Sequence, residues 1–375
     1  MSTRHALSAL ARALHAAAWL WLAVTTLWLA TTTRPLEAAE EPASPQPSAT
    51  QPANPQPSNP QPANPQPGSP QPANPQPAGE PVALRWKWTP NQEFLAAFDQ
   101  NVTTDSTFGA KTLRLSIASR ATQRWIVESV DPQGAAILKQ SYVNIAVTVD
   151  MGMGNTIAFD TERPSSPTGE TRRLAEALQP LVGPTWTIVV SPRGEMSRFA
   201  PSAEWASATE TVAKNSVLQP LFATDATNAT NATNGTNGAV GPIRQAFVTL
   251  PESPLAPTRG WRSTLPFQAS FGVGEISTQY TYEGAAKFDT LTVAAVRSES
   301  RVDAKPGVGK VAKGRELKEQ KIGGRLLFDP VNGMLVESRQ SQAFRTESRV
   351  RDVPLAAQLS SELTITIRKS NAASP

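Results

Sequence analysis

The sequence contains no cysteine, and its two histidines, His5 and His15, both lie at the start of the chain. The N-terminal stretch has the features of a targeting segment, so an exported product would contain neither a thiol nor an imidazole. Such a product cannot form a disulfide, a cysteine nucleophile or a Ser-His-Asp triad, and it lacks the ligands on which zinc sites rely. Carboxylate chemistry, lysine chemistry, hard-metal binding or no chemistry at all remain. We therefore assign no catalytic, cofactor-binding or metal-binding residue from the sequence.

The N-terminal region begins with basic residues and continues into an uncharged apolar run at residues 16–33, which ends before Arg34. This order is typical of a secretory signal. The run is also long enough for a membrane-spanning helix, which needs about 17–25 residues. We predict that residues 1–39 are a signal peptide, cleaved near Ala39, or an N-terminal membrane anchor. In both cases the chain that follows is extracytoplasmic, in the periplasm, the cell envelope or the medium.

Residues 40–81 are rich in proline and contain little apolar surface. The tetrapeptide Asn-Pro-Gln-Pro recurs at residues 54–57, 64–67 and 74–77. Proline fixes φ and favours an extended conformation in the residue before it, so this segment is predicted to be a disordered or polyproline II linker. A spacer that holds a domain away from a membrane and an inert linker are both consistent with it.

Strand signals dominate residues 82–375, a length that supports a sizeable core. Apolar and polar residues alternate over residues 113–117, 143–149 and 363–367. In the second stretch the expected buried face is formed by Val143, Ile145, Val147 and Val149. Alternation of this kind leaves one face of a strand buried and the other in water, which favours an antiparallel sheet.

Three turn sequences carry proline early and glycine late between apolar runs, at residues 131–134, 191–194 and 329–333. This order is typical of hairpins. A meander of hairpins is therefore favoured over strand–helix–strand units.

Two helices are predicted between the hairpins. Leu174, Leu178 and Leu181 recur at helical spacing, and a glycine and a proline follow them. Ser202 is a suitable N-cap for a second helix that carries Trp205. The predicted fold is α+β and mostly β: a curved, half-barrel-like antiparallel sheet of hairpins, with one or two helices against its buried face.

A repeat of Asn, Thr and Ala at about residues 224–239 interrupts this domain. It is predicted to be a disordered loop, because a simple polar repeat buries little surface. Strand and turn signals occur on both sides of it, in residues 82–223 and 240–375. Residues 82–375 are therefore predicted to form a β-rich extracytoplasmic domain that contains this loop.

Four short segments combine aromatic, glycine and proline residues: Leu84 to Gln92, Leu250-Pro251 with Gly260-Trp261, Tyr280 to Gly284, and Gly324 to Asp329 with Gly333 to Leu335. Together they resemble an uncharacterised family of exported bacterial proteins, a domain-of-unknown-function group. The resemblance implies an envelope-associated β-rich domain with no established activity. The chain is also distantly similar to lipoprotein-carrier half-barrels, which hold an acyl chain between a curved sheet and helices. It lacks the cysteine of lipid-anchored relatives.

A basic stretch lies between Lys305 and Lys321. An anionic-lipid contact and a solvated hairpin loop are both consistent with it, and the second is favoured. It does not match a phosphate-binding loop, because no Ser or Thr follows Lys310 and the glycine spacing differs. The net charge of the whole chain is only +4, which argues against a nucleic-acid partner.

Carboxylates are the remaining candidates for catalysis, because glycoside hydrolysis needs two of them and no imidazole. The candidates are Glu195, Glu204, Glu275, Glu283, Asp289 and Glu337. The sequence does not pair them. A solubilising role is therefore the simpler interpretation.

Tryptophans could stack on sugars or fill the core. Those outside the apolar N-terminal run are Trp86, Trp88, Trp125, Trp186, Trp205 and Trp261. Each lies in or beside a predicted strand or helix, so core packing is favoured.

These observations favour an exported, envelope-associated, non-catalytic binding or structural module on a Pro-rich stalk. Its expected partners are an apolar or lipid ligand, held between sheet and helices, and the cell envelope or a membrane surface. No cofactor is expected. The alternative is a carboxylate-dependent hydrolase that acts on envelope polysaccharide.

Overall fold

The computed structural model describes residues 80–152, 154–163, 167–214, 246–269, 272–305, 316–350 and 353–370. The predicted signal or anchor, nearly all of the predicted linker and the predicted loop at 224–239 lie outside these ranges. No helix within them is long and apolar enough to cross a membrane.

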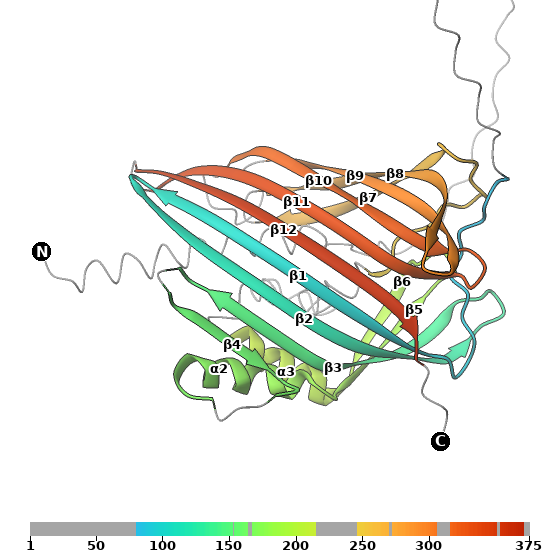
Figure 1. The fold of residues 1–375 in the computed structure, drawn as a ribbon, viewed down its shortest axis with the longest axis horizontal. Coiled ribbons are helices and arrows are strands. Elements are labelled where there is room, and N and C mark those ends of the chain that lie inside the picture. The colour runs from blue at the N-terminus through green and yellow to red at the C-terminus, as the bar shows by residue number, and fades with distance from the viewer. Residues whose placement is uncertain are drawn as a thin grey trace, which may run out of the picture. The chain divides into compact units, whose positions relative to one another are not determined.

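Within the described residues, twelve strands form one antiparallel sheet (Figure 1). The strands are β1 Glu93–Phe108, β2 Lys111–Val130, β3 Ala136–Asp150, β4 Thr156–Asp160, β5 Thr185–Val190, β6 Met196–Pro201, β7 Gly260–Ala269, β8 Gly272–Phe288, β9 Leu291–Lys305, β10 Glu316–Asp329, β11 Met334–Val350 and β12 Val353–Lys369. The helices are α2 Gly169–Leu178, the short 3₁₀ helix η1 Gln179–Leu181, and α3 Ala203–Lys214. This architecture confirms the predicted fold class.

The strand order is β6-β5-β3-β2-β1-β12-β11-β10-β9-β8-β7, and β4 pairs with β3 beside this path. From β7 to β12 the chain runs as a meander in which each strand pairs with the next. The two halves of the domain meet where β1 pairs with β12 over a long register, from Phe94 opposite Lys369 to Phe108 opposite Leu355. The first and last strands of the sequence are therefore neighbours in the middle of the sheet.

The two ends of the sheet are built differently. At the hairpin end lie the turns that join β2 to β3, β5 to β6, β8 to β9 and β10 to β11. The far end is the end at which β1 turns into β2, at Gly109 (Figure 1). The three turns predicted from proline and glycine all form, and all lie at the hairpin end.

The sequence of the turn between β10 and β11 supplies the hydrogen bonds and the backbone conformation that the turn needs. One carboxylate oxygen of Asp329, Oδ1, accepts backbone hydrogen bonds from Val331 (2.9 Å) and Asn332 (3.0 Å). The other, Oδ2, accepts a hydrogen bond from the Asn332 side chain at 2.6 Å. Gly333 closes the turn with a φ of 64°, a conformation that glycine adopts without steric cost.

Two extended segments cross the hairpin end: the first crossing segment, residues 82–88, and the second crossing segment, residues 246–255. Backbone hydrogen bonds join them to the turns and to each other: Trp86 to Pro192 (2.8 Å), Lys87 to Gly333 (2.9 Å), Leu250 to Arg193 (2.7 Å), and Val82 and Leu255 in both directions (2.9 Å each). The guanidinium group of Arg85 also donates to the backbone oxygens of Pro251 and Glu252. The hairpin end is therefore covered by chain that is fixed to it.

Both predicted helices form. Leu174, Leu178 and Leu181 are buried, α2 packs beside β4, and α3 packs on β5. The backbone N–H of Trp205 donates to the Ser202 hydroxyl at 3.2 Å, as expected of an N-cap. The helices lie beside β3 and β4 (Figure 1), so they cover only one flank of the sheet.

The predicted alternation at residues 143–149 is interrupted in β3. The register between β2 and β3 shifts next to Thr122, so Tyr142 faces the core while the Val143 side chain is 44% exposed. The side chain of Asn144 fills the irregularity, because its oxygen accepts the backbone N–H of Thr122 at 3.0 Å. The prediction that Val143 shares the buried face was wrong, since an extra residue in one strand reverses the phase beyond it.

Candidate functional site

The candidate site is the face of the sheet that carries the core, which we call the concave face; the opposite face is the convex face. Asp329, in the turn described above, is the only Asp, Glu, Lys or Arg among the buried residues that the structure describes. In the described strands, the register places charged residues on the concave face only at the ends of strands. These are the exposed Lys111, Lys287 and Lys369. Between the strand tips, the concave face of the described strands is therefore uncharged.

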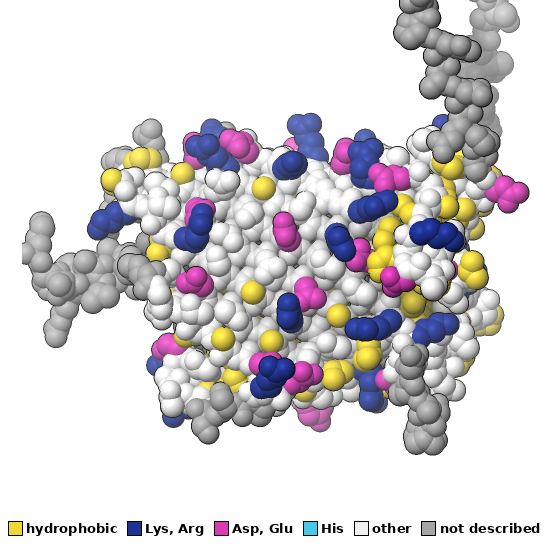
Figure 2. Space-filling model, viewed as in Figure 1, with side chains coloured by type: hydrophobic (Ala, Val, Ile, Leu, Met, Phe, Trp, Pro, Cys, Tyr) yellow, Lys and Arg dark blue, Asp and Glu magenta, His cyan; other side chains and the backbone are white. Residues whose placement is uncertain are grey.

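The convex face carries the charge of the sheet, with both signs interspersed over its strands (Figure 2). Ion pairs join Arg114 to Asp105 (2.7 Å) and Arg120 to Asp99 (2.7 Å). The hydrogen bond from Arg114 lowers the pKa of Asp105. Exposed pairs of this kind contribute only about 0–1 kcal/mol each, so they keep this face soluble rather than hold the fold together.

A cluster of aromatic rings fills the concave face at the hairpin end. Trp86 stacks on Trp88, with ring centres 5.1 Å apart, and meets Phe328 edge-on at 5.6 Å. Phe247 of the second crossing segment stacks on Trp125 at 5.0 Å. The crossing segments are thus held by packing as well as by hydrogen bonds.

The core role predicted for the tryptophans is confirmed. Trp86, Trp125, Trp186 and Trp205 are buried, and Trp88 and Trp261 are partly buried against the same core. On the flank that the helices cover, Trp186 and Trp205 lie with ring centres 4.2 Å apart beside Tyr142. Burial raises the pKa of Tyr142 to about 12, although a hydrogen bond to Gln123 opposes the shift.

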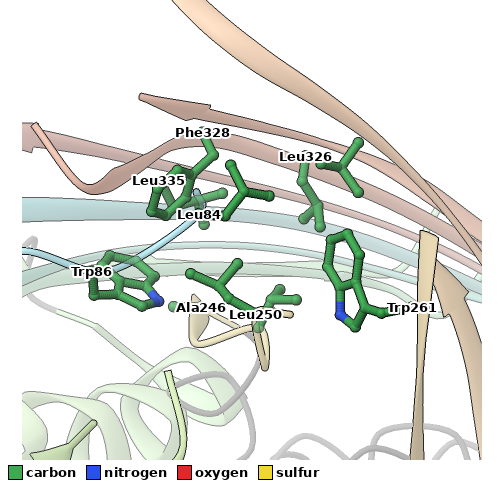
Figure 3. Close-up of a pocket in the computed structure, with 10 residues that line it drawn as sticks. Leu84, Trp86, Ala246, Leu250, Trp261, Leu326, Phe328 and Leu335 are labelled. Atoms are coloured by element: carbon green, nitrogen blue, oxygen red, sulfur yellow. The ribbon is translucent and has the colours of Figure 1, made fainter. Parts of the chain in front are cut away.

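An apolar cavity lies between the crossing segments and the sheet (Figure 3). Leu84, Trp86, Leu250, Trp261, Leu326, Phe328 and Leu335 are among its lining residues. Its volume is about 10 Å³, close to the least that holds one water molecule. The segments above it are hydrogen-bonded to the turns, so this cavity is a small packing gap in the core.

Several neutral polar groups on the concave face have partners. Others do not: the indole N–H groups of Trp86, Trp88 and Trp205 and the Nε2 atoms of Gln123 and Gln140 are buried without a hydrogen-bond partner. The indole N–H groups of Trp125 and Trp186 donate to Gln123 (2.9 Å) and Gln140 (2.7 Å). On β10, Gln320 bonds both backbone groups of Val302 on β9, at 2.6 and 2.9 Å. On β8, the hydroxyls of Thr278 and Ser300 lie 2.8 Å apart.

Four other side chains with unpartnered polar atoms lie together in the far half of the concave face, and we call them the neutral polar cluster. They are Thr104 and Ser106 on β1, Gln342 on β11 and Ser361 on β12. The three hydroxyl oxygens and the Gln342 carbonyl oxygen are buried and have no hydrogen-bond partner among the described residues. A buried polar group without a partner costs about 1–3 kcal/mol, so this cluster costs stability in the structure as it stands.

The sequence contained a signal for this cluster. Ser361 continues the alternation of Leu363, Ile365 and Ile367 by one step, and Thr104 follows Val102 in the same phase. Polar residues in the phase of a buried face indicate either a structural hydrogen bond or a site. Which of the two applies depends on neighbouring strands, and the sequence alone does not show them.

The six candidate carboxylates are dispersed. Glu275, Glu283 and Glu337 lie on the convex side of β8 and β11, Glu195 and Asp289 lie in turns, and Glu204 lies in the first turn of α3. Their described ionic partners are arginines: Glu283 with Arg297 (3.5 Å) and Arg325 (3.4 Å), Glu337 with Arg339 (3.0 Å), and Glu195 with Arg193 (3.6 Å). The structure does not bring these acids together at the concave face.

The basic stretch joins two paired strands. Lys305 ends β9 and Lys321 lies on β10, which pairs with β9. The residues between the two strands, 306–315, lie outside the described ranges. Within those ranges, no group of three or more His, Asp and Glu side chains is placed to hold a metal ion.

No protein-family model and no curated protein matches the sequence. Among solved structures, the chain is similar to lipovitellin, in a structure described by its lipid–protein interactions, with 13% identity, a TM-score of 0.37, and coverage of 77% of this chain and 26% of that one. It is similar to a DUF1329 family protein from Desulfovibrio piger (7% identity, TM-score 0.14, 76% and 88% covered). A third similar structure is the translocator domain of autotransporter NalP from Neisseria meningitidis, with 4% identity, a TM-score of 0.10, and coverage of 72% of this chain and 87% of that one.

The chain thus spans about a quarter of the lipovitellin chain. All three TM-scores lie below 0.5, so function has to be inferred from the residues of this chain. Its uncharged concave face fits a binding module.

Proposed function

We propose that this protein is an exported, envelope-associated and non-catalytic binding module, and that the concave face of its sheet holds an apolar ligand. The Pro-rich segment at residues 40–81 would tether this module to its N-terminal signal or anchor. The export part of the proposal is supported by the basic start and apolar run of the N-terminus.

The observation that carries the binding role is the separation of charge between the two faces. Buried strand positions are apolar or neutral, while the ion pairs lie on the convex side. An uncharged surface of this length suits a ligand without charge, because a buried charge without a partner is strongly unfavourable. A site for charged polysaccharide would instead need charged or paired acidic groups on this face.

The far end is the side from which a ligand would reach this face, since the crossing segments cover the hairpin end. Phe108 lies at the tip of β1 in the register of the concave face, and its side chain is 44% exposed. Leu355 lies opposite it on β12 and is only partly buried.

The test uses the full-length protein and the uncharged fluorophore N-phenylnaphthylamine, whose emission rises in apolar surroundings. Adjacent residues of β2 supply a matched pair of variants, because Ser119 lies in the register of the concave face, opposite Gln100, and Ala118 is exposed on the convex face. We expect Ser119→Lys to weaken binding of the fluorophore at least about tenfold, since a desolvated charge would face the ligand. Ala118→Lys should leave binding unchanged.

Two results would overturn the binding role: no binding of the fluorophore by the unmodified protein, or equal effects of the two lysine variants. Circular dichroism of each variant checks that the sheet has formed. Native mass spectrometry of protein purified from its host supplies a second readout, because a carrier should retain an apolar ligand. Protease treatment of intact and permeabilised cells tests export separately, since an extracytoplasmic domain is cleaved before the inner membrane is opened.

A further inference from the structure

The neutral polar cluster lies on three neighbouring strands. Ser361 on β12 lies opposite Gln342 on β11 and opposite Val102 on β1. Thr104 and Ser106 follow Val102 in the same phase along β1, toward the far end. The four polar side chains therefore occupy one area of the concave face, beyond the part that the crossing segments cover.

Thr104 gives the clearest reason to look for a ligand. Its side chain is 1% exposed, and its hydroxyl has no partner. Valine has the same shape and would fill this position without burying a hydroxyl that bonds to nothing. By contrast, Thr278, at a comparable depth on β8, has its hydroxyl 2.8 Å from that of Ser300.

A small polar gap adjoins the cluster. Gln342 and Ser361 of the cluster line it together with Gln100, Gln340, Ser341, Ile322 and Leu363. Its volume is about 10 Å³, close to the least that holds one water-sized group. None of the lining residues is charged, and hydroxyl and amide groups offer both donors and acceptors.

From these observations we infer that the neutral polar cluster binds the uncharged, hydrogen-bonding head of the apolar ligand, such as an ester or an alcohol. The inference rests on the proposed function and names the ligand class. Hydroxyl and amide groups match an ester carbonyl or a hydroxyl, which need a few neutral hydrogen bonds. A carboxylate or phosphate would bring a charge next to side chains that cannot neutralise it.

The test compares three apolar probes that differ in the head: monooleoylglycerol, oleate and octadecene. Each displaces N-phenylnaphthylamine from the full-length protein. We expect monooleoylglycerol to bind at least about tenfold more tightly than oleate or octadecene, because one or two hydrogen bonds in a dry site separate them. The double variant Thr104→Val with Ser361→Ala should remove this preference for monooleoylglycerol.

Thr103→Val is the matched control, since Thr103 lies next to Thr104 on β1 but bonds Ser116 on the convex side at 3.3 Å. It should retain the preference for monooleoylglycerol. Unfolding in urea gives a readout that does not depend on the ligand: Thr104→Val should be at least as stable as the unmodified protein, and Thr278→Val less stable.

The outcomes separate this inference from the proposed function. If no probe binds, the binding role itself fails. If octadecene binds but the double variant still prefers monooleoylglycerol, the head-group site is wrong and the binding role stands. If Thr104→Val loses as much stability as Thr278→Val, a bound water already satisfies the Thr104 hydroxyl, and the inference is overturned.

Discussion

The hairpin end and the far half of the concave face belong to the same sheet but are completed in different ways. At the hairpin end, two crossing segments are fixed by backbone hydrogen bonds, and aromatic rings fill the space beneath them. In the far half, hydroxyl and amide groups are buried without partners, whereas the unpartnered polar atoms of the hairpin-end cluster are the indole N–H groups of Trp86 and Trp88. The difference indicates that backbone hydrogen bonds and aromatic packing anchor the hairpin end, whereas hydroxyl and amide groups define the far half.

The difference between the two ends follows from which strands are joined by tight turns at each end of the sheet. Turns that need proline, glycine and aspartate gather at the hairpin end, where their carbonyl groups receive the crossing segments. The far half is built from long strands, whose side chains alone determine its character. A ligand site in the far half would thus leave the anchoring part of the core undisturbed.

The largest expected effect comes from removing an aromatic ring at the hairpin end. Trp86→Ala should lower the free energy of unfolding by about 3–5 kcal/mol, because a large buried side chain is lost and a cavity remains. Phe108→Ala at the far end should cost less than about 1 kcal/mol, because the Phe108 ring is 44% exposed. Urea unfolding of both variants measures the difference, and equal losses would contradict the division between the two ends.

A glycine pair sharpens the same comparison. Gly333 and Gly109 have similar φ values, 64° and 59°, but a Cβ on Gly333 would collide with the backbone and side chain of Lys87, whereas a Cβ on Gly109 would meet nothing within 4 Å. Gly109→Ala should therefore cost only the backbone strain, about 1–2 kcal/mol. Gly333→Ala should cost at least about 1 kcal/mol more, since overpacking adds to the strain. Thermal or urea unfolding compares the two variants.

The smallest expected effect is a dependence on pH. Burial by itself raises the pKa of Asp329, but hydrogen bonds from Asn332 and Val331 outweigh it and bring the pKa below its ordinary value. A carboxyl whose pKa is lowered by folding stabilises the protein above its unfolded pKa, and this contribution is lost as the pH falls through the folded pKa. Stability should therefore decline between about pH 5 and pH 2.

Asp329→Asn should flatten this decline and cost about 1–2 kcal/mol at neutral pH, because the carboxylate bonds to the turn are weakened. Asp105→Asn is the matched control at the far end. The Arg114 hydrogen bond lowers the pKa of Asp105 as well, but that pair is exposed to solvent and to screening. Urea unfolding across the pH range should show a clear change in slope for Asp329→Asn only.

Much of the fold could be predicted from the sequence, because its signals are local. The turns at 131–134, 191–194 and 329–333 depend on proline, glycine and aspartate within a few residues of one another. The helix at Leu174, Leu178 and Leu181 depends on spacing alone. Val143 was placed wrongly, since a bulge depends on the partner strand and leaves no clear trace in the alternation.

The candidate site could be predicted only in part. The six candidate acids lie on the convex face, in turns and in the first turn of α3. The tryptophans were correctly placed in the core, but their gathering at one end depends on crossing segments far apart in the sequence. The alternation along β12 and β1 places Ser361 and Thr104 on the buried face of their own strands. Nothing in either strand shows that the two residues lie close together.

The sequence by itself determined where the chain turns, which residues share a face wherever a strand alternates without a bulge, and that cysteine and histidine chemistry is absent from residues 16–375. Only the tertiary structure decided that β1 lies beside β12, that two distant segments cover the same end, and that four unpartnered polar groups gather in the far half. The physical reason is that alternation and turn chemistry act over a few residues. The choice of neighbouring strands depends instead on which faces bury the most apolar surface together.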